Sequence, residues 1–86
     1  MRILGFHENT FNEYLDWQET DATKFKKINS LLKDILRHPF TGIDKPEPLK
    51  YNTEKYWSRR ISDEHRLVYQ VLDDIIMVIS CNGHYK

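Results

Sequence analysis

The sequence predicts an α+β domain in which two N-terminal helices pack on one face of a small, mostly antiparallel sheet. Apolar residues recur at helical spacing in the first half of the chain, and three strand-like runs follow between residues 56 and 81. Short polar turns separate these runs, so consecutive strands are expected to pair with one another. Helices first and strands afterwards favour two segregated layers, in the order βααβββ.

The N-terminal half contains one predicted strand and both predicted helices. Residues 2–6 form a short apolar run, weakened as a strand by Gly5. A helix is expected from about residue 9 to 18. A second is expected to run to about residue 37, with Thr20-Asp21 as its N-cap. Its apolar positions follow a period near 3.6, which indicates a core-facing stripe rather than a binding groove: Phe25, Ile28, Leu31, Leu32, Ile35 and Leu36.

Prolines divide the middle of the chain. Pro39 ends the second helix, and a loop follows. Pro46 and Pro48 restrict the backbone on both sides of Glu47 and keep it out of a helix. We expect Glu47 to lie in this loop and the second strand to begin at Leu49-Lys50.

A hairpin is expected from Tyr56 to Tyr69, with its turn at residues 62–64. Side chains alternate along a strand, so Arg60 and Arg66 on the two neighbouring strands can converge on one anion. The last run, residues 75–81, is almost continuously apolar and predicts a strand buried on both faces.

Length and composition indicate a single domain spanning residues 1–86. The one cysteine, Cys81, suits a reducing compartment, and no signal peptide or run of about 20 apolar residues is visible. A cytoplasmic location without membrane contact is therefore expected. The 13 basic and 13 acidic residues give zero formal charge, which argues against a strong non-specific nucleic-acid binder. Basic residues nevertheless cluster locally, at positions 24–37 and 45–66.

Six short motifs, in order, resemble the YoeB family of bacterial toxins in the RelE/ParE superfamily. They are Trp17-Gln18, Lys27-Ile-Asn29, Lys45-Pro-Glu-Pro-Leu-Lys50, Trp57-Ser-Arg-Arg-Ile61, Glu64-His-Arg-Leu-Val-Tyr69 and His84-Tyr85. The resemblance runs from near Ile3 to Tyr85. It implies a RelE-like fold and the toxin of a type II toxin–antitoxin system. It also implies a ribosome-dependent mRNA endoribonuclease that cleaves by 2′-hydroxyl attack on the adjacent phosphate.

The resemblance also implies site residues. Such cleavage needs a base for the 2′-hydroxyl, positive charge for the phosphorane and an acid for the departing 5′-oxygen. The motif positions that match the family are Glu47 as the base, Arg66 as the phosphate-stabilising group and His84 as the acid. RNA contacts are further expected from Lys50, Arg60 and Tyr85, the last by stacking on a base.

Each of these residues also has a plainer interpretation. Glu47 can be a solvated loop carboxylate, and the two arginines can be exposed partners of Asp63 or Glu64. The His84-Tyr85 end can fray, and Gly83 is expected to loosen it. His7, His38 and His65 share no metal-ligand spacing with one another or with Cys81, so no metal or cofactor is predicted, and His65 is expected to be structural.

Expected partners are a YefM-like antitoxin, the ribosome and its mRNA, with operator DNA reached only through the antitoxin. A homodimer is left open. Two other functions compete with the nuclease. One is a ParE-like inhibitor of DNA gyrase, which needs no acid–base pair. The other is a catalytically weakened protein that binds its antitoxin and co-regulates transcription.

Overall fold

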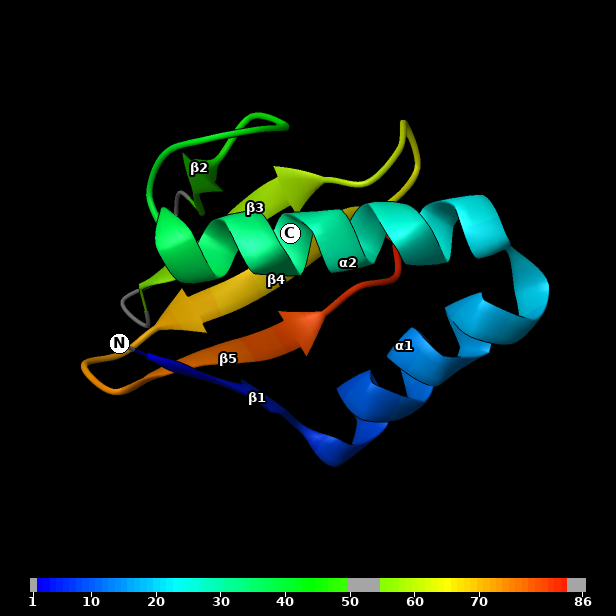
Figure 1. Cartoon of the computed structure of the whole chain (residues 1–86), viewed down its shortest axis with the longest axis horizontal. Helices are drawn as coiled ribbons and strands as arrows, with labels where there is room; N and C mark the ends of the chain where they lie inside the picture. The colour runs from blue at the N-terminus through cyan, green and yellow to red at the C-terminus, as the bar shows by residue number, and fades with distance from the viewer. Residues whose placement is uncertain (1, 50–54, 84–86) are drawn as a thin grey trace.

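The chain folds into a five-stranded sheet with two helices, and a computed structural model describes residues 2–49 and 55–83 (Figure 1). The elements in order are β1 (Ile3–Phe6), α1 (Glu8–Thr20), α2 (Ala22–Arg37), β2 (Glu47–Pro48), β3 (Tyr56–Arg60), β4 (Arg66–Val71) and β5 (Ile75–Ser80). The strand order is β1-β5-β4-β3-β2. Only the β1–β5 pair is parallel among these strands. The predicted α+β class and mostly antiparallel sheet are confirmed.

Helix α2 provides most of the helical contribution to the core. It begins after Asp21, whose side chain accepts a hydrogen bond from the Lys24 backbone N–H at 3.2 Å. It ends at Arg37, two residues before Pro39. Its buried side chains are Ile28, Leu31, Leu32 and Ile35. Burying each contributes about 1.5–3 kcal/mol, which explains why the apolar stripe fixes the face of this helix.

Helix α1 is attached differently, because only Thr10 on it is buried. The Thr10 hydroxyl donates to the carbonyl of Ile79 in β5 at 2.7 Å, and the ring of Tyr14 packs against Phe25 of α2. This helix therefore links β5 to α2. Neither helix of the described chain is long and apolar enough to cross a membrane.

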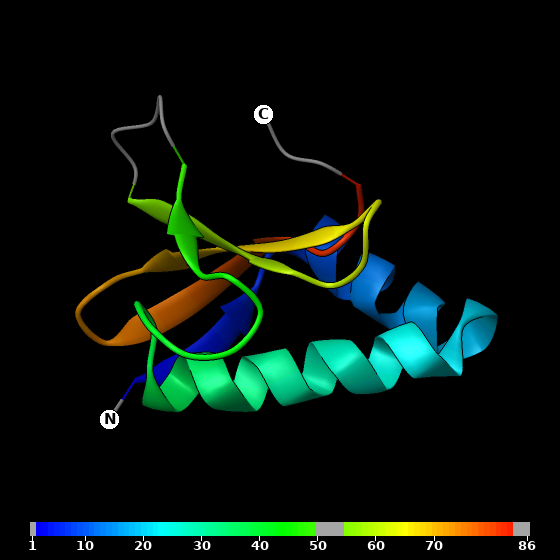
Figure 2. The same ribbon diagram turned by 90° about the horizontal axis from the view of Figure 1, so that it is seen from above.

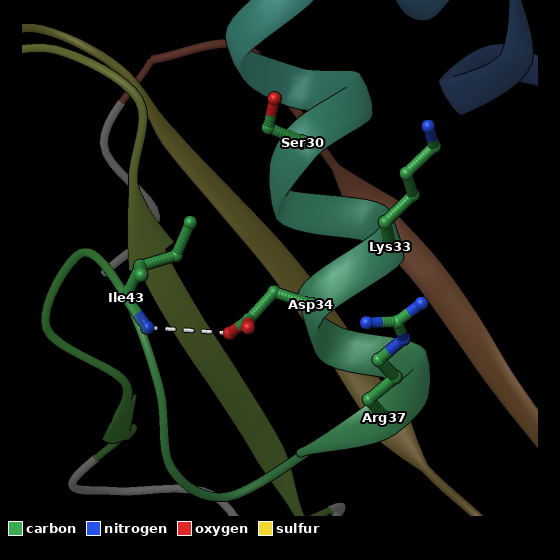
Figure 3. A pocket seen from close by; sticks show the side chains of 5 residues that line it. All are labelled: Ser30, Lys33, Asp34, Arg37 and Ile43. Atoms are coloured by element: carbon green, nitrogen blue, oxygen red, sulfur yellow. Dashed lines mark hydrogen bonds between the residues drawn. The ribbon is translucent and has the colours of Figure 1, made fainter.

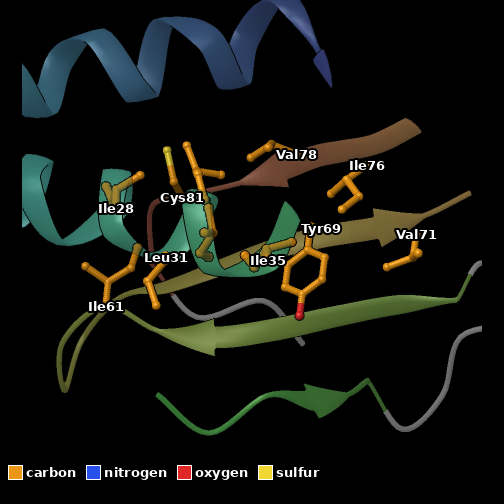
Figure 4. Close-up of a cluster of buried hydrophobic side chains, with 11 residues drawn as sticks. Ile28, Leu31, Ile35, Ile61, Tyr69, Val71, Ile76, Val78 and Cys81 are labelled. Carbon is orange, nitrogen blue, oxygen red and sulfur yellow. The ribbon is translucent and has the colours of Figure 1, made fainter. Parts of the chain in front are cut away.

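The core lies between α2 and the central strands (Figure 4). The α2 side chains meet Leu67, Tyr69 and Val71 from β4 and Ile76 and Val78 from β5. Cys81 is also fully buried here, and burial raises the pKa of its thiol to about 12. Cys81 is thus an inert structural thiol.

Three expectations about strands are wrong. The predicted order βααβββ counts four strands, whereas the structure has βααββββ, because the short edge strand β2 is added to the three strands that follow it. Strand β2 starts at Glu47 rather than at Leu49, because flanking prolines are compatible with a short edge strand as long as Glu47 and Leu49 supply the N–H groups. Strand β5 is not buried on both faces. Ile76 and Val78 are fully buried, whereas Ile75 and Met77 between them are half-buried. The other face of the sheet carries no helix among the described residues (Figure 2).

Candidate functional site

The sheet register places three predicted site residues on the helix-free face. Arg59 of β3 points toward α2, where it contacts Asp34, so its neighbours Ser58 and Arg60 point to the opposite face. Glu47 lies opposite Ser58, and Arg66 lies directly opposite Arg60. Residues paired across a sheet share a face, so the carboxylate and both guanidinium groups emerge on the same side.

The same register gives the spacing of the site. Neighbouring strands lie about 4.8 Å apart, and residues two apart on one strand lie about 6.6 Å apart. Glu47 and Arg66 are two strands and one such step apart, so their Cα atoms are separated by roughly 12 Å. Glu47 is exposed and Arg66 is half-buried. A carboxylate and a guanidinium group therefore lie on one face of the sheet, where Ser58 beside Glu47 and Val68 beside Arg66 are both buried.

Arg66 has the properties of an unfilled anion site. Its Nη1 is buried and has no hydrogen-bond partner among the residues that the structure describes. A buried guanidinium nitrogen without an acceptor costs free energy, which an incoming phosphate oxygen would recover. The plainer interpretation, in which Asp63 or Glu64 pairs with the arginines, does not account for this nitrogen of Arg66.

Arg60 is instead occupied. Its guanidinium pairs with Asp63 in the turn between β3 and β4, where both side chains are substantially exposed. Exposed pairs of this kind contribute little to stability and exchange readily, so Arg60 remains available as a second anion contact.

The described part of the C-terminal segment ends beside Arg66. The Gly83 N–H donates to Nδ1 of His65 at 2.8 Å, and the Gly83 carbonyl accepts from the Arg66 backbone N–H at 3.0 Å. His65 packs edge-on against Trp17, with ring centroids 4.8 Å apart. His65 is therefore structural, as expected.

Three predicted site residues, Lys50, His84 and Tyr85, lie outside the described residues.

The expectation that Gly83 loosens the His84-Tyr85 end concerns residues outside the described ones and stays a prediction, whereas Gly83 itself is held by two hydrogen bonds. Its N–H and carbonyl are both hydrogen-bonded, and its φ of +76° lies in the region that favours glycine. A Cβ added there would meet nothing within 4 Å, so only the backbone conformation demands glycine.

Gly83→Ala is expected to lower the free energy of unfolding by about 1 kcal/mol, because a Cβ is strained at this φ. Urea unfolding of the variant against Asn82→Ala, a neighbouring substitution at an exposed position, measures this. Equal midpoints for the two variants would show that the turn does not require glycine.

The sequence interpretation missed Arg59, the largest fully buried side chain of the described chain. Its guanidinium group holds the pKa of the Asp34 carboxyl below the usual range by donating a hydrogen bond to it. Burial raises the pKa of Tyr69, whose hydroxyl accepts from Arg59, so this phenol stays protonated. Strand alternation offered a signal, since Arg59 shares a strand face with Trp57 and Ile61.

No group of three or more His, Cys, Asp or Glu side chains in residues 2–49 and 55–83 is arranged to hold a metal ion. The predicted site residues that the structure describes are one carboxylate, Glu47, and two guanidinium groups, Arg60 and Arg66.

Comparison with known proteins identifies the family of the chain. Residues 6–85 match the family model for the YoeB-like toxin of bacterial type II toxin–antitoxin systems. Toxin YoeB of Escherichia coli K12 is 55% identical over 82 residues, covering 95% of this chain and 98% of that protein. The YoeB dimer from Staphylococcus aureus superposes with a TM-score of 0.90 at 47% identity, covering 98% of each chain. In the YoeB–YefM complex from the same organism the corresponding values are 0.86 and 45%, covering 99% of each chain. The chain therefore belongs to the family of YoeB-like toxins of bacterial type II toxin–antitoxin systems.

Proposed function

We propose that this toxin is a ribosome-dependent mRNA endoribonuclease. The observation that supports it most is the common face of Glu47, Arg60 and Arg66, on which a carboxylate lies across from two guanidinium groups. A protein that only blocks a partner needs positive charge or apolar surface, whereas this face offers a base and an anion site together.

In the proposed reaction the Glu47 carboxylate takes the proton of a ribose 2′-hydroxyl. The 2′-oxygen forms a bond to the adjacent phosphorus while the bond from phosphorus to the 5′-oxygen breaks. Arg66 stabilises the negative charge of the phosphorane, with Arg60 as a second contact. His84 donates a proton to the 5′-oxygen, leaving a 2′,3′-cyclic phosphate and a 5′-hydroxyl.

RNA binding is assigned to Lys50, Arg60 and Tyr85. Lys50 and Arg60 contact phosphates, and Tyr85 stacks on a base. The formal charge of the chain is zero, so these basic residues act locally, and the ribosome supplies most of the positioning of the message. This accounts for a nuclease that is not itself strongly basic.

The toxin is expected to act in the cytoplasm, where ribosomes and messages are found, and to be neutralised there by a YefM-like antitoxin. The S. aureus relative forms a YoeB–YefM complex and a dimer, which supports both an antitoxin partner and a homodimer for this chain. Contact with operator DNA is assigned to the antitoxin.

Brief expression of the toxin followed by primer extension on an abundant message tests the proposal. We expect new 5′ ends within codons, and the same ends when purified toxin is added to ribosomes programmed with that message. Message alone, without ribosomes, is the control and is expected to stay largely intact.

Two results would contradict the nuclease. Gyrase-linked DNA breaks without message cleavage would favour the ParE-like inhibitor. Neither cleavage nor DNA breaks, together with antitoxin-dependent repression of an operator, would favour the catalytically weakened co-regulator.

A further inference from the structure

All five N–H groups of the Arg59 side chain donate hydrogen bonds, either to the loop after α2 or to Asp34 and Tyr69, which also contact that loop. Although the side chain is 0% exposed, each of its five N–H groups has an acceptor. Three are carbonyls of the loop after α2, on His38, Thr41 and Ile43, at 2.6, 2.7 and 3.0 Å. The Asp34 carboxylate and the Tyr69 hydroxyl accept the remaining two, at 2.6 and 3.2 Å.

Two further contacts complete this network. The Tyr69 hydroxyl donates to the carbonyl of Pro39 at 2.7 Å. Asp34 accepts the backbone N–H of Ile43 at 3.2 Å, so that the carboxylate lies between α2 and the loop (Figure 3). Residues 38–43 are thus held against the sheet mainly by these hydrogen bonds, since Phe40 and Ile43 are each 47% exposed, although the Phe40 ring also packs on Trp57 of β3.

The loop leads directly to Glu47 through a strained segment. Asp44 and Lys45 have φ values of +60° and +55°, which non-glycine residues rarely adopt. Such conformations cost free energy and persist only where the surroundings enforce them. Here the Asp44 carbonyl accepts a hydrogen bond from the backbone N–H of Arg60 at 2.9 Å. This bond fixes the end of the loop beside β3.

Strand β2 is too weak to position Glu47 alone. It has only two residues and is an edge strand that pairs only with β3. The pairing of Glu47 with Ser58 and the bond from Leu49 N–H to the Tyr56 carbonyl hold it there. A strand this short keeps its register only if the chain that enters it is fixed.

We propose that Arg59 and Tyr69 are positioning residues for Glu47, which act on the reaction through the loop of residues 38–45. The proposal rests on the nuclease function proposed above. Arg59 is buried between Ser58 and Arg60, which both point to the helix-free face. In this proposal Arg59 holds the Glu47 carboxylate in place without itself touching the RNA.

Tyr69→Phe tests this with little change in volume, because it removes only the hydroxyl that joins Arg59 to Pro39. Tyr14→Phe is the matched control. It removes a hydroxyl that donates to Asn29 between α1 and α2, at 2.6 Å and outside the network. Single-turnover cleavage of message on programmed ribosomes, with toxin in excess, gives a maximal rate and a half-saturating concentration for each variant.

We expect the maximal rate to fall about tenfold for Tyr69→Phe and to stay unchanged for Tyr14→Phe, because displaced catalytic groups lose rate at saturation. A loss of folded protein alone would instead raise the half-saturating concentration. In a Glu47→Gln background, Tyr69→Phe is expected to add no further loss, since both substitutions act on one group. Equal maximal rates for the two tyrosine variants, or additive losses, would overturn the proposal.

Amide hydrogen exchange of the free toxin provides a readout that needs no RNA. The amides of Arg60 and Leu49 report the loop and β2, and both are expected to exchange about tenfold faster in Tyr69→Phe than in Tyr14→Phe. A wild-type toxin that cuts no message would reject the proposed function, whereas unchanged exchange at both amides would reject the ordering of this loop by Tyr69.

Discussion

Glu47→Gln is expected to slow message cleavage on the ribosome by on the order of 10²–10⁴, and thereby to relieve growth arrest, while the protein stays folded. The amide keeps the size of the carboxylate but cannot accept the 2′-hydroxyl proton. Glu47 is exposed on a two-residue strand and no core contact depends on its charge, so the fold should tolerate the change. Single-turnover cleavage together with urea unfolding separates the two effects.

Glu19→Gln is the matched control, because it makes the same chemical change at an exposed position near the end of α1. It is expected to leave both the cleavage rate and the stability unchanged. Full activity from folded Glu47→Gln protein would remove Glu47 from the role of base.

The arginine of the same site should show the same division between activity and stability. Arg66→Ala removes a guanidinium group whose Nη1 has no acceptor in the described chain, so stability should change by less than about 1 kcal/mol. Cleavage should fall on the order of 10²–10³, because the phosphorane loses its charged hydrogen bonds. A large loss of stability would mean that Arg66 is mainly a structural residue.

The helices and the hairpin could be predicted because their signals are local. The apolar period of Ile28, Leu31 and Ile35 fixes the buried face of α2. The turn at residues 62–64 sets the register that places Arg60 opposite Arg66.

Other features depend on partners far away in the sequence. Whether Glu47 belongs to a loop or a strand is decided by β3, to which it pairs. The one-sided burial of β5 depends on the absence of a helix over the far face of the described sheet, which an apolar run cannot reveal.

The sequence motifs name candidate residues for the site, but they do not predict the contacts that hold those residues in place. Motif positions identify Glu47 and Arg66 without showing what holds them. Arg59 stands beside Arg60 in the sequence, and the two differ only in the face that each occupies. Arg60 is exposed and pairs with Asp63, whereas Arg59 is enclosed by loop carbonyls from residues 38–43. Those carbonyls belong to a loop whose path no sequence motif describes.

Asp34→Ala is expected to lower the free energy of unfolding at pH 7 by about 3 kcal/mol. Removing one partner of a buried ion pair costs about 3–5 kcal/mol, since the other charge stays buried without compensation. The lower end applies because the Asp34 side chain is 21% exposed although Arg59 is fully buried. Asp63→Ala is the control. It breaks the exposed pair with Arg60 and should cost less than about 1 kcal/mol.

The pH dependence of this difference identifies its cause. Arg59 holds the folded-state pKa of Asp34 below its ordinary value of 3.8, so the ionised carboxylate stabilises the fold at pH values above that number. This contribution is lost as the pH falls from the ordinary pKa through the lowered one, because over this range the unfolded state binds a proton more readily than the folded state. The difference in stability between wild type and Asp34→Asn, measured by urea unfolding, should therefore be constant from pH 7 to 5 and shrink below pH 4. A difference that persists unchanged at pH 2 would show that the Asp34 charge does not stabilise the loop.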